Sequence, residues 1–70
     1  MQLTFGERLR FYRRKKRVSQ FQLELETGCA FGVICRFEKN KVNPNLQTIN
    51  KISRALQLSD REFLDIWRRC

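Results

Sequence analysis

Five consecutive cations, from Arg13 to Arg17, form the densest group of potential ligand-binding side chains in this 70-residue sequence. Ser19 lies shortly after them. Its hydroxyl can accept a hydrogen bond from a free backbone amide of a helix that begins at Gln20, and Gln22 completes the capping signature. The free amides and the positive dipole end of that helix would then lie beside the basic run. This arrangement suits a phosphate group, and a merely solvated helix end is the alternative.

The sequence contains no pattern typical of catalysis or metal binding. It has no histidine, no glycine-rich phosphate loop, and three cysteines without CxxC spacing or a visible base. We therefore expect no enzyme activity, no cofactor and no metal site. The cysteines are expected as reduced thiols, with Cys29 in the core, Cys35 near the surface and Cys70 on a frayed end. Without an apolar N-terminal run of signal length or a membrane span, we expect a bacterial cytoplasmic protein.

Charge and length limit the possible partners and the domain organisation. Fifteen Lys and Arg against seven Asp and Glu give a net charge of +8, which destabilises a compact monomer unless a polyanion neutralises it. Nucleic acid is the expected partner, and a merely soluble basic surface is the alternative. Binding to an anionic membrane is disfavoured because the apolar stripe of the first helix is needed for the core. A chain this short should form one domain, residues 1–70, with a tight helical core.

Apolar spacing and capping signatures predict the first three helices. The first should begin near Phe5, after a capping box formed by Thr4 and Glu7, and run to about Lys16. Phe11 lies beside its apolar stripe and is expected to widen that face, with a contact surface as the alternative. The second and third helices should lie within 20–38, joined by a three- to four-residue turn in which Gly28 takes a positive φ.

Two further helices are predicted toward the C-terminus. Asn40 should end the third helix, and Asn45 should cap a fourth. The core stripe expected on the fourth helix is Leu46, Ile49, Ile52, Ser53 and Leu56. Ser59 and Glu62 should cap a fifth helix whose large apolar residues exceed the needs of one contact stripe, which favours a partner subunit. The expected dimer interface is Phe63, Leu64, Ile66 and Trp67; the alternative is that Trp67 closes the core of a monomer.

Several residues fall at the spacing used by one group of proteins: Ser19-Gln20, Leu23, Gly28, Ile34, Arg36-Phe37-Glu38, Asn40-Lys41 and Asn43-Pro44. Through them, the sequence from about Phe5 to Leu64 resembles the helix-turn-helix domains of phage repressors and Cro, the Xre family. The resemblance implies an all-α, compact five-helix bundle of the lambda-repressor type. It further implies a small transcriptional regulator, a repressor that binds double-stranded DNA sequence-specifically as a homodimer on a palindromic operator.

The resemblance also implies roles for individual positions, with the third helix in the major groove. The implied base contacts are Ala30, Phe31, Gly32, Val33, Cys35 and Arg36. The implied phosphate contacts are Arg14, Arg17, Gln20, Lys39, Lys41 and Asn43. Arg13 and Glu38 are implied to form a buried ion pair. Because the base-contact set has few hydrogen-bonding groups, direct readout should fall on Arg36 and on apolar contact with thymine methyls, supplemented by DNA shape.

Glu24 departs from the family pattern, which usually has alanine at this position. A partly buried carboxylate needs a partner. Either an arginine of the first helix reaches it, or the second helix rotates so that Phe21 and Leu25 face inward, and Thr27 points to the same local repacking.

An alternative function is that the apolar third helix docks on a protein. The chain would then be an antitoxin-like or accessory regulator whose partner contacts the DNA. That reading leaves Arg13 to Arg17, Lys39 and Lys41 without a role.

Overall fold

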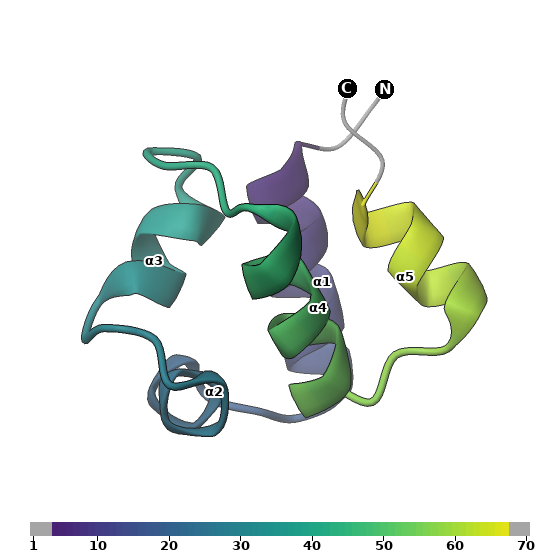
Figure 1. Cartoon of the computed structure of the whole chain (residues 1–70), viewed down its shortest axis with the longest axis horizontal. Coiled ribbons are helices and arrows are strands. Elements are labelled where there is room, and N and C mark those ends of the chain that lie inside the picture. The colour runs from purple at the N-terminus through teal and green to yellow at the C-terminus, as the bar shows by residue number, and fades with distance from the viewer. Residues whose placement is uncertain (1–3, 68–70) are drawn as a thin grey trace.

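The computed structural model describes residues 4–67, except for the side chain of Trp67, and this range folds into five helices (Figure 1). The helices are α1 (Phe5–Lys15), α2 (Gln20–Thr27), α3 (Val33–Glu38), α4 (Leu46–Ala55) and α5 (Asp60–Trp67). The prediction of an all-α five-helix bundle is confirmed. None of the helices in the described range has the length and apolar character needed to cross a membrane.

Local capping explains where most of the helices begin. At α1, Glu7 N donates to Thr4 Oγ1 at 3.2 Å, and Thr4 N donates to the Glu7 carboxylate at 3.0 Å. Ser59 and Glu62 form the same reciprocal pair at α5. The hydroxyl of Ser19 caps α2 as predicted, but the Gln22 side chain bonds Glu26 instead of completing a capping box. These short-range bonds satisfy amides that have no partner inside the helix.

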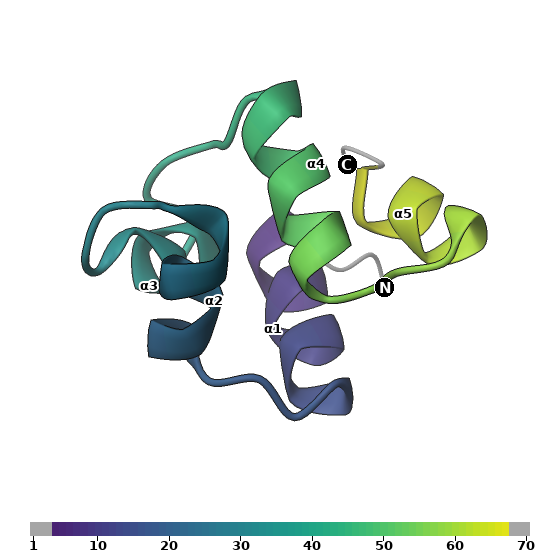
Figure 2. The ribbon, with the colours of Figure 1, turned by 60° about the horizontal axis from the view of Figure 1, so that its bottom comes forward.

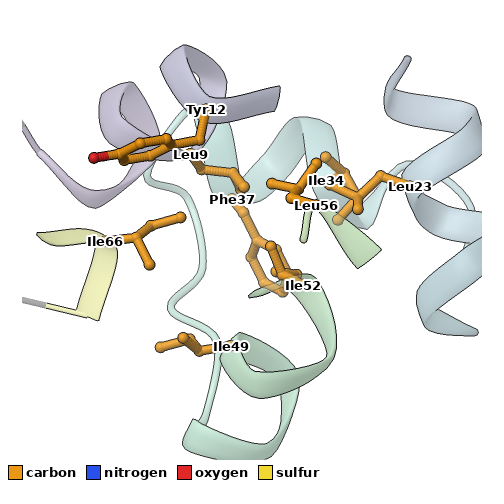
Figure 3. Packing of buried hydrophobic residues seen from close by; sticks show 9 residues of the cluster. All are labelled: Leu9, Tyr12, Leu23, Ile34, Phe37, Ile49, Ile52, Leu56 and Ile66. Atoms are coloured by element: carbon orange, nitrogen blue, oxygen red, sulfur yellow. The ribbon is translucent and has the colours of Figure 1, made fainter. Parts of the chain in front are cut away.

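The helices enclose one apolar core (Figure 3). Its nine buried residues are Leu9, Tyr12, Leu23, Ile34, Phe37, Ile49, Ile52, Leu56 and Ile66. Helix α1 packs against α3 and α5, while α2 packs against α3 and α4. In both ribbon views α3 and α5 lie on opposite sides of the pair formed by α1 and α4 (Figures 1 and 2). The arrangement leaves the outer surface of α3 far from α5.

Three expectations about burial are wrong. Leu46 is 50% exposed, because it lies at the first position of α4, ahead of the buried part of that helix. Phe11 is also exposed and meets Tyr12 edge to face, with ring centroids 5.2 Å apart, so it belongs to the surface of α1. Cys29, which follows the end of α2 and lies outside any helix, is only half-buried, like Cys35. Cys70 lies outside the described residues.

The N-terminus of α1 touches the C-terminus of α3 at Gly6. A Cβ atom on Gly6 would lie 2.4 Å from the Glu38 carbonyl oxygen and 2.6 Å from that of Phe37. The Gly6 amide donates to Asn40 Oδ1 at 3.0 Å, and Asn40 Nδ2 donates to Thr4 Oγ1 at 2.9 Å. Asn40 has a φ of 60°, as predicted for the residue that ends this helix. The close approach therefore fixes the position of α3 relative to α1.

Candidate nucleic-acid interface

Helices α2 and α3 form a helix-turn-helix whose connection, residues 28–32, is longer than predicted. Gly28 has a φ of 70°, which confirms the predicted positive φ, and Gly32 has a φ of 83°. Because this geometry favours glycine, the two glycines allow the left-handed backbone conformation that the chain adopts at both ends of the connection. As α3 begins only at Val33, Ala30 and Phe31 lie in the turn before the helix.

The buried carboxylate of Glu24 holds this connection. Glu24 is 7% exposed, and its Oε2 accepts a hydrogen bond from the Gly32 amide at 2.8 Å. Its partner is therefore a backbone amide, where the sequence led us to expect an arginine or a rotated helix. The rotation is wrong because Phe21 and Leu25 are both exposed. The carboxylate thus joins the middle of α2 to the residue preceding α3.

Glu38, in the last turn of α3, is the centre of a second polar cluster. Arg13 donates from Nε to Glu38 Oε2 at 2.5 Å and from Nη2 to Oε1 at 3.2 Å. Gln20 Nε2 also donates to Glu38 Oε1, at 3.0 Å. Arg13 Nη1 donates to the Val18 carbonyl at 3.0 Å. The cluster ties α1 and the start of α2 to α3, and it uses one donor of the Gln20 side chain.

The cations of the basic run differ in their partners. Arg13 pairs with Glu38, while Lys15 and Lys16 lie 3.2 Å and 3.5 Å from the carboxylate of Glu62. The Ser59 backbone amide, followed by Lys15, lowers the pKa of Glu62 to about 2, so this carboxylate stays charged. Within residues 4–67, Arg14 and Arg17 are exposed and have no carboxylate within 4.0 Å. They are the two members of the run expected to contact phosphates.

The residues proposed to contact bases differ in accessibility. Phe31 is 85% exposed, and Ala30 and Arg36 are exposed as well. Gly32, Val33 and Cys35 are half-buried, and Val33 packs partly against the core. The surface available to a large partner is therefore formed mainly by Ala30, Phe31 and Arg36. The remaining proposed phosphate contacts after α3, Lys39, Lys41 and Asn43, are all exposed.

A family model described as helix-turn-helix matches residues 9–63. This chain belongs to the Xre-type helix-turn-helix family. It is similar to the HTH-type transcriptional regulator SinR of Bacillus subtilis strain 168, with 33% identity over 61 residues. The match covers 86% of this chain and 55% of SinR, so the chain spans about half the length of that relative. No solved structure matches the chain significantly.

Three positions in this helix-turn-helix domain have contacts that sequence reasoning missed. Gly6 is the contact point of α1 and α3, Asn40 bonds back to Gly6, and Gln20 bonds Glu38. The contact at Gly6 has one available signal in the sequence, a glycine in the first turn of a helix. Glycine lowers helix stability, so its presence there indicates a close approach of another part of the backbone. Among the described residues no group of acidic or cysteine side chains could hold a metal ion.

Proposed function

We propose that this chain is a small transcriptional regulator that binds double-stranded DNA sequence-specifically. The observation that carries the proposal is the set of exposed cations near the helix-turn-helix that have no carboxylate within 4.0 Å in the described part of the chain. These cations include Arg14, Arg17, Arg36, Lys39 and Lys41. Because unpaired cations gain most from neutralising phosphates, this surface favours a polyanion.

The cations divide into two roles. Arg14 and Arg17 at the end of α1, and Lys39, Lys41 and Asn43 after α3, would grip phosphates, with Gln20 assisting from the start of α2. Arg36 is exposed on α3 and can bond a guanine bidentately in the major groove. Phosphate contacts would fix the position of the domain, and Arg36 with the preceding turn would read the sequence.

We further propose a homodimer on a palindromic operator. A single recognition helix with one strong polar reader adds little to nonspecific phosphate binding, whereas a two-fold dimer doubles the base contacts. Leu64 on α5 is 62% exposed, and α5 lies on the side of the molecule away from α3 (Figure 1). Phe63 is half-buried and Ile66 is fully enclosed, so Ile66 cannot contact a partner without leaving the core. The side chain of Trp67 lies outside the described residues.

Repression is the regulatory outcome we propose, because a bound dimer excludes other proteins from the same stretch of DNA. The function would place the chain in the cytoplasm of a bacterium, together with its DNA.

Selection of bound DNA from a random pool tests the proposal directly. The expected result is enrichment of a two-fold motif with half-sites about one helical turn apart. Salt-sensitive binding without any enriched motif would contradict sequence-specific recognition. A chain that binds no DNA at moderate salt would contradict the proposal as a whole.

One observation favours a second candidate function, docking on a protein. Three large apolar side chains of the helix-turn-helix, Phe21, Leu25 and Phe31, are exposed, and aromatic residues are enriched at protein interfaces. Under this reading the chain is an antitoxin-like or accessory regulator whose partner contacts the DNA. The same selection distinguishes the two functions, because an accessory regulator would enrich no motif when tested alone.

A further inference from the structure

Phe31 is the most exposed large apolar side chain in the described part of the molecule, at 85%. It lies outside any helix, in the turn that precedes α3. The Val33 amide donates to the Ala30 carbonyl at 3.2 Å, and Gly32 has φ 83° and ψ −5°. This is the geometry of a type II turn over residues 30–33, with Phe31 at its second position. The ring therefore stands at the apex of a defined turn.

Glu24 fixes both ends of the connection that carries Phe31. Its backbone carbonyl accepts hydrogen bonds from the Gly28 and Cys29 amides, the latter at 3.1 Å. Its side chain accepts from the Gly32 amide at 2.8 Å. The carboxylate bond is nearly buried, which makes it costly to leave unmade. Alanine at position 24 would keep the two hydrogen bonds to the backbone carbonyl. It would lose the hydrogen bond from the Gly32 amide, which holds the residue next to Phe31.

We propose that Glu24 is a positioning residue that holds Phe31 against the C5-methyl groups of thymines in the major groove. The proposal rests on the DNA-binding function proposed above. An aromatic ring has no hydrogen bond to offer a base edge, and the thymine methyl is the apolar group that the major groove presents. The exposed cations Arg36, Lys39 and Lys41, which follow the turn on α3 and after it, favour DNA over an apolar protein surface as the occupant.

Replacing thymine with deoxyuridine tests this, because the substitution removes only the methyl group. With the site obtained from the random-pool selection, each methyl in contact with Phe31 should be worth about fourfold in affinity, the equivalent of one buried carbon. Wild type should discriminate thymine from deoxyuridine at one position in each half-site. Phe31→Ala should bind the two DNAs equally. If Phe31→Ala keeps the wild-type discrimination, the methyl contact is wrong.

The role of Glu24 has its own comparison. Glu24→Gln retains an oxygen that can accept the Gly32 amide, so it should keep the discrimination, whereas Glu24→Ala should lose it while still binding DNA in a salt-dependent manner. Loss in both variants would assign the effect to charge and overturn positioning through the Gly32 bond. Equal, wild-type discrimination in both would overturn any role for Glu24.

A measurement on the wild-type chain covers the case in which Glu24→Ala fails to fold. DNA carrying 5-iododeoxyuridine places iodine where the thymine methyl lies, and irradiation should crosslink that position to Phe31, identified by peptide mass spectrometry. A crosslink to any other residue overturns the inference. If DNA binds but thymine and deoxyuridine are equivalent at every position, only this inference fails, whereas absence of DNA binding would refute the proposed function itself.

Discussion

Arg13 on α1 and Glu38 on α3 form a bidentate ion pair in which the Glu38 side chain is only 5% exposed. Gln20 on α2 donates a hydrogen bond to Glu38, and Arg13 donates one to the Val18 carbonyl. The pair is therefore part of a network that joins three helices. Because Gly6 touches the Glu38 carbonyl from α1, the end of α3 is held by side-chain and backbone contacts together. The orientation of the proposed recognition helix thus depends on α1.

Removing one partner of this pair should be strongly destabilising. Glu38→Ala leaves the Arg13 guanidinium nearly buried and unpaired, which should cost about 3 kcal/mol or more of unfolding free energy. Thermal and urea melts measure the loss. The control is Glu26→Ala, which removes an exposed carboxylate from α2. A melting temperature for Glu38→Ala that matches the control would show that the pair contributes no more than a surface contact.

Gly6→Ala should also destabilise the fold, although alanine favours helices. Its Cβ would meet two backbone carbonyls at 2.6 Å or less, and backbone cannot move aside as a side chain can. The overpacking should cost about 1 to 3 kcal/mol, more than the roughly 0.5 to 1 kcal/mol gained from helix propensity. Gly28→Ala is the comparison, because a methyl there meets nothing within 4 Å and only the positive φ opposes it. A Gly6→Ala variant as stable as wild type would disprove the steric argument.

Stability should fall in alkaline solution through Tyr12. Burial, followed by the hydrogen bond that its hydroxyl donates to Asp65 at 2.7 Å, raises the pKa of Tyr12 to about 12. An unfolded tyrosine ionises near pH 10, so the unfolded chain loses this proton before the folded chain does. The contribution of Tyr12 to the free energy of unfolding is therefore fully present below pH 10 and is lost between pH 10 and 12. Tyr12 is the sole tyrosine, so tyrosinate absorbance follows it directly. Tyr12→Phe should remove this part of the pH dependence, whereas titration of the native chain near pH 10 would contradict it.

Helix starts were predictable from the sequence because capping is local. Thr4 with Glu7, and Ser59 with Glu62, need only residues three positions apart, and both boxes form as expected. Burial was less predictable, because it depends on which distant element covers a given face. Leu46 continues the stripe of α4 in sequence, yet no neighbouring element covers the first turn of that helix enough to bury it.

The contacts of the candidate site were also predictable only in part. The family pattern points to Arg13 and Glu38, and the structure contains their contact. The partner of Glu24 could not be found this way, since it is a backbone amide eight residues away and an amide has no sequence signature. The length of the turn was also missed, because its second positive φ occurs at Gly32, a residue that the family pattern assigned to base contact.

The proposed phosphate and base contacts should separate in a salt titration. Lys41→Ala should weaken binding to all sequences alike and lower the slope of log affinity against log salt by about 1. Arg36→Ala should mainly relax the choice of base at one position, at a cost of about 1 to 3 kcal/mol. Both side chains are exposed, so neither change should disturb folding. An Arg36→Ala variant whose ratio of specific to nonspecific affinity is unchanged would refute the readout assignment.

The proposed dimer can be tested with two exposed leucines on different helices. Leu64 on α5 is 62% exposed and Leu46 on α4 is 50% exposed, so truncating either should leave the monomer folded. If α5 forms the interface, Leu64→Ala should lower the mass seen by ultracentrifugation at micromolar concentration and weaken operator binding, and Leu46→Ala should do neither. Trp67→Ala should act like Leu64→Ala. A dimer through α5 would leave α3 of each protomer uncovered, because α3 and α5 lie on opposite sides of the pair formed by α1 and α4 (Figure 2). A native chain that sediments as a monomer both free and on its site would rule out this assembly.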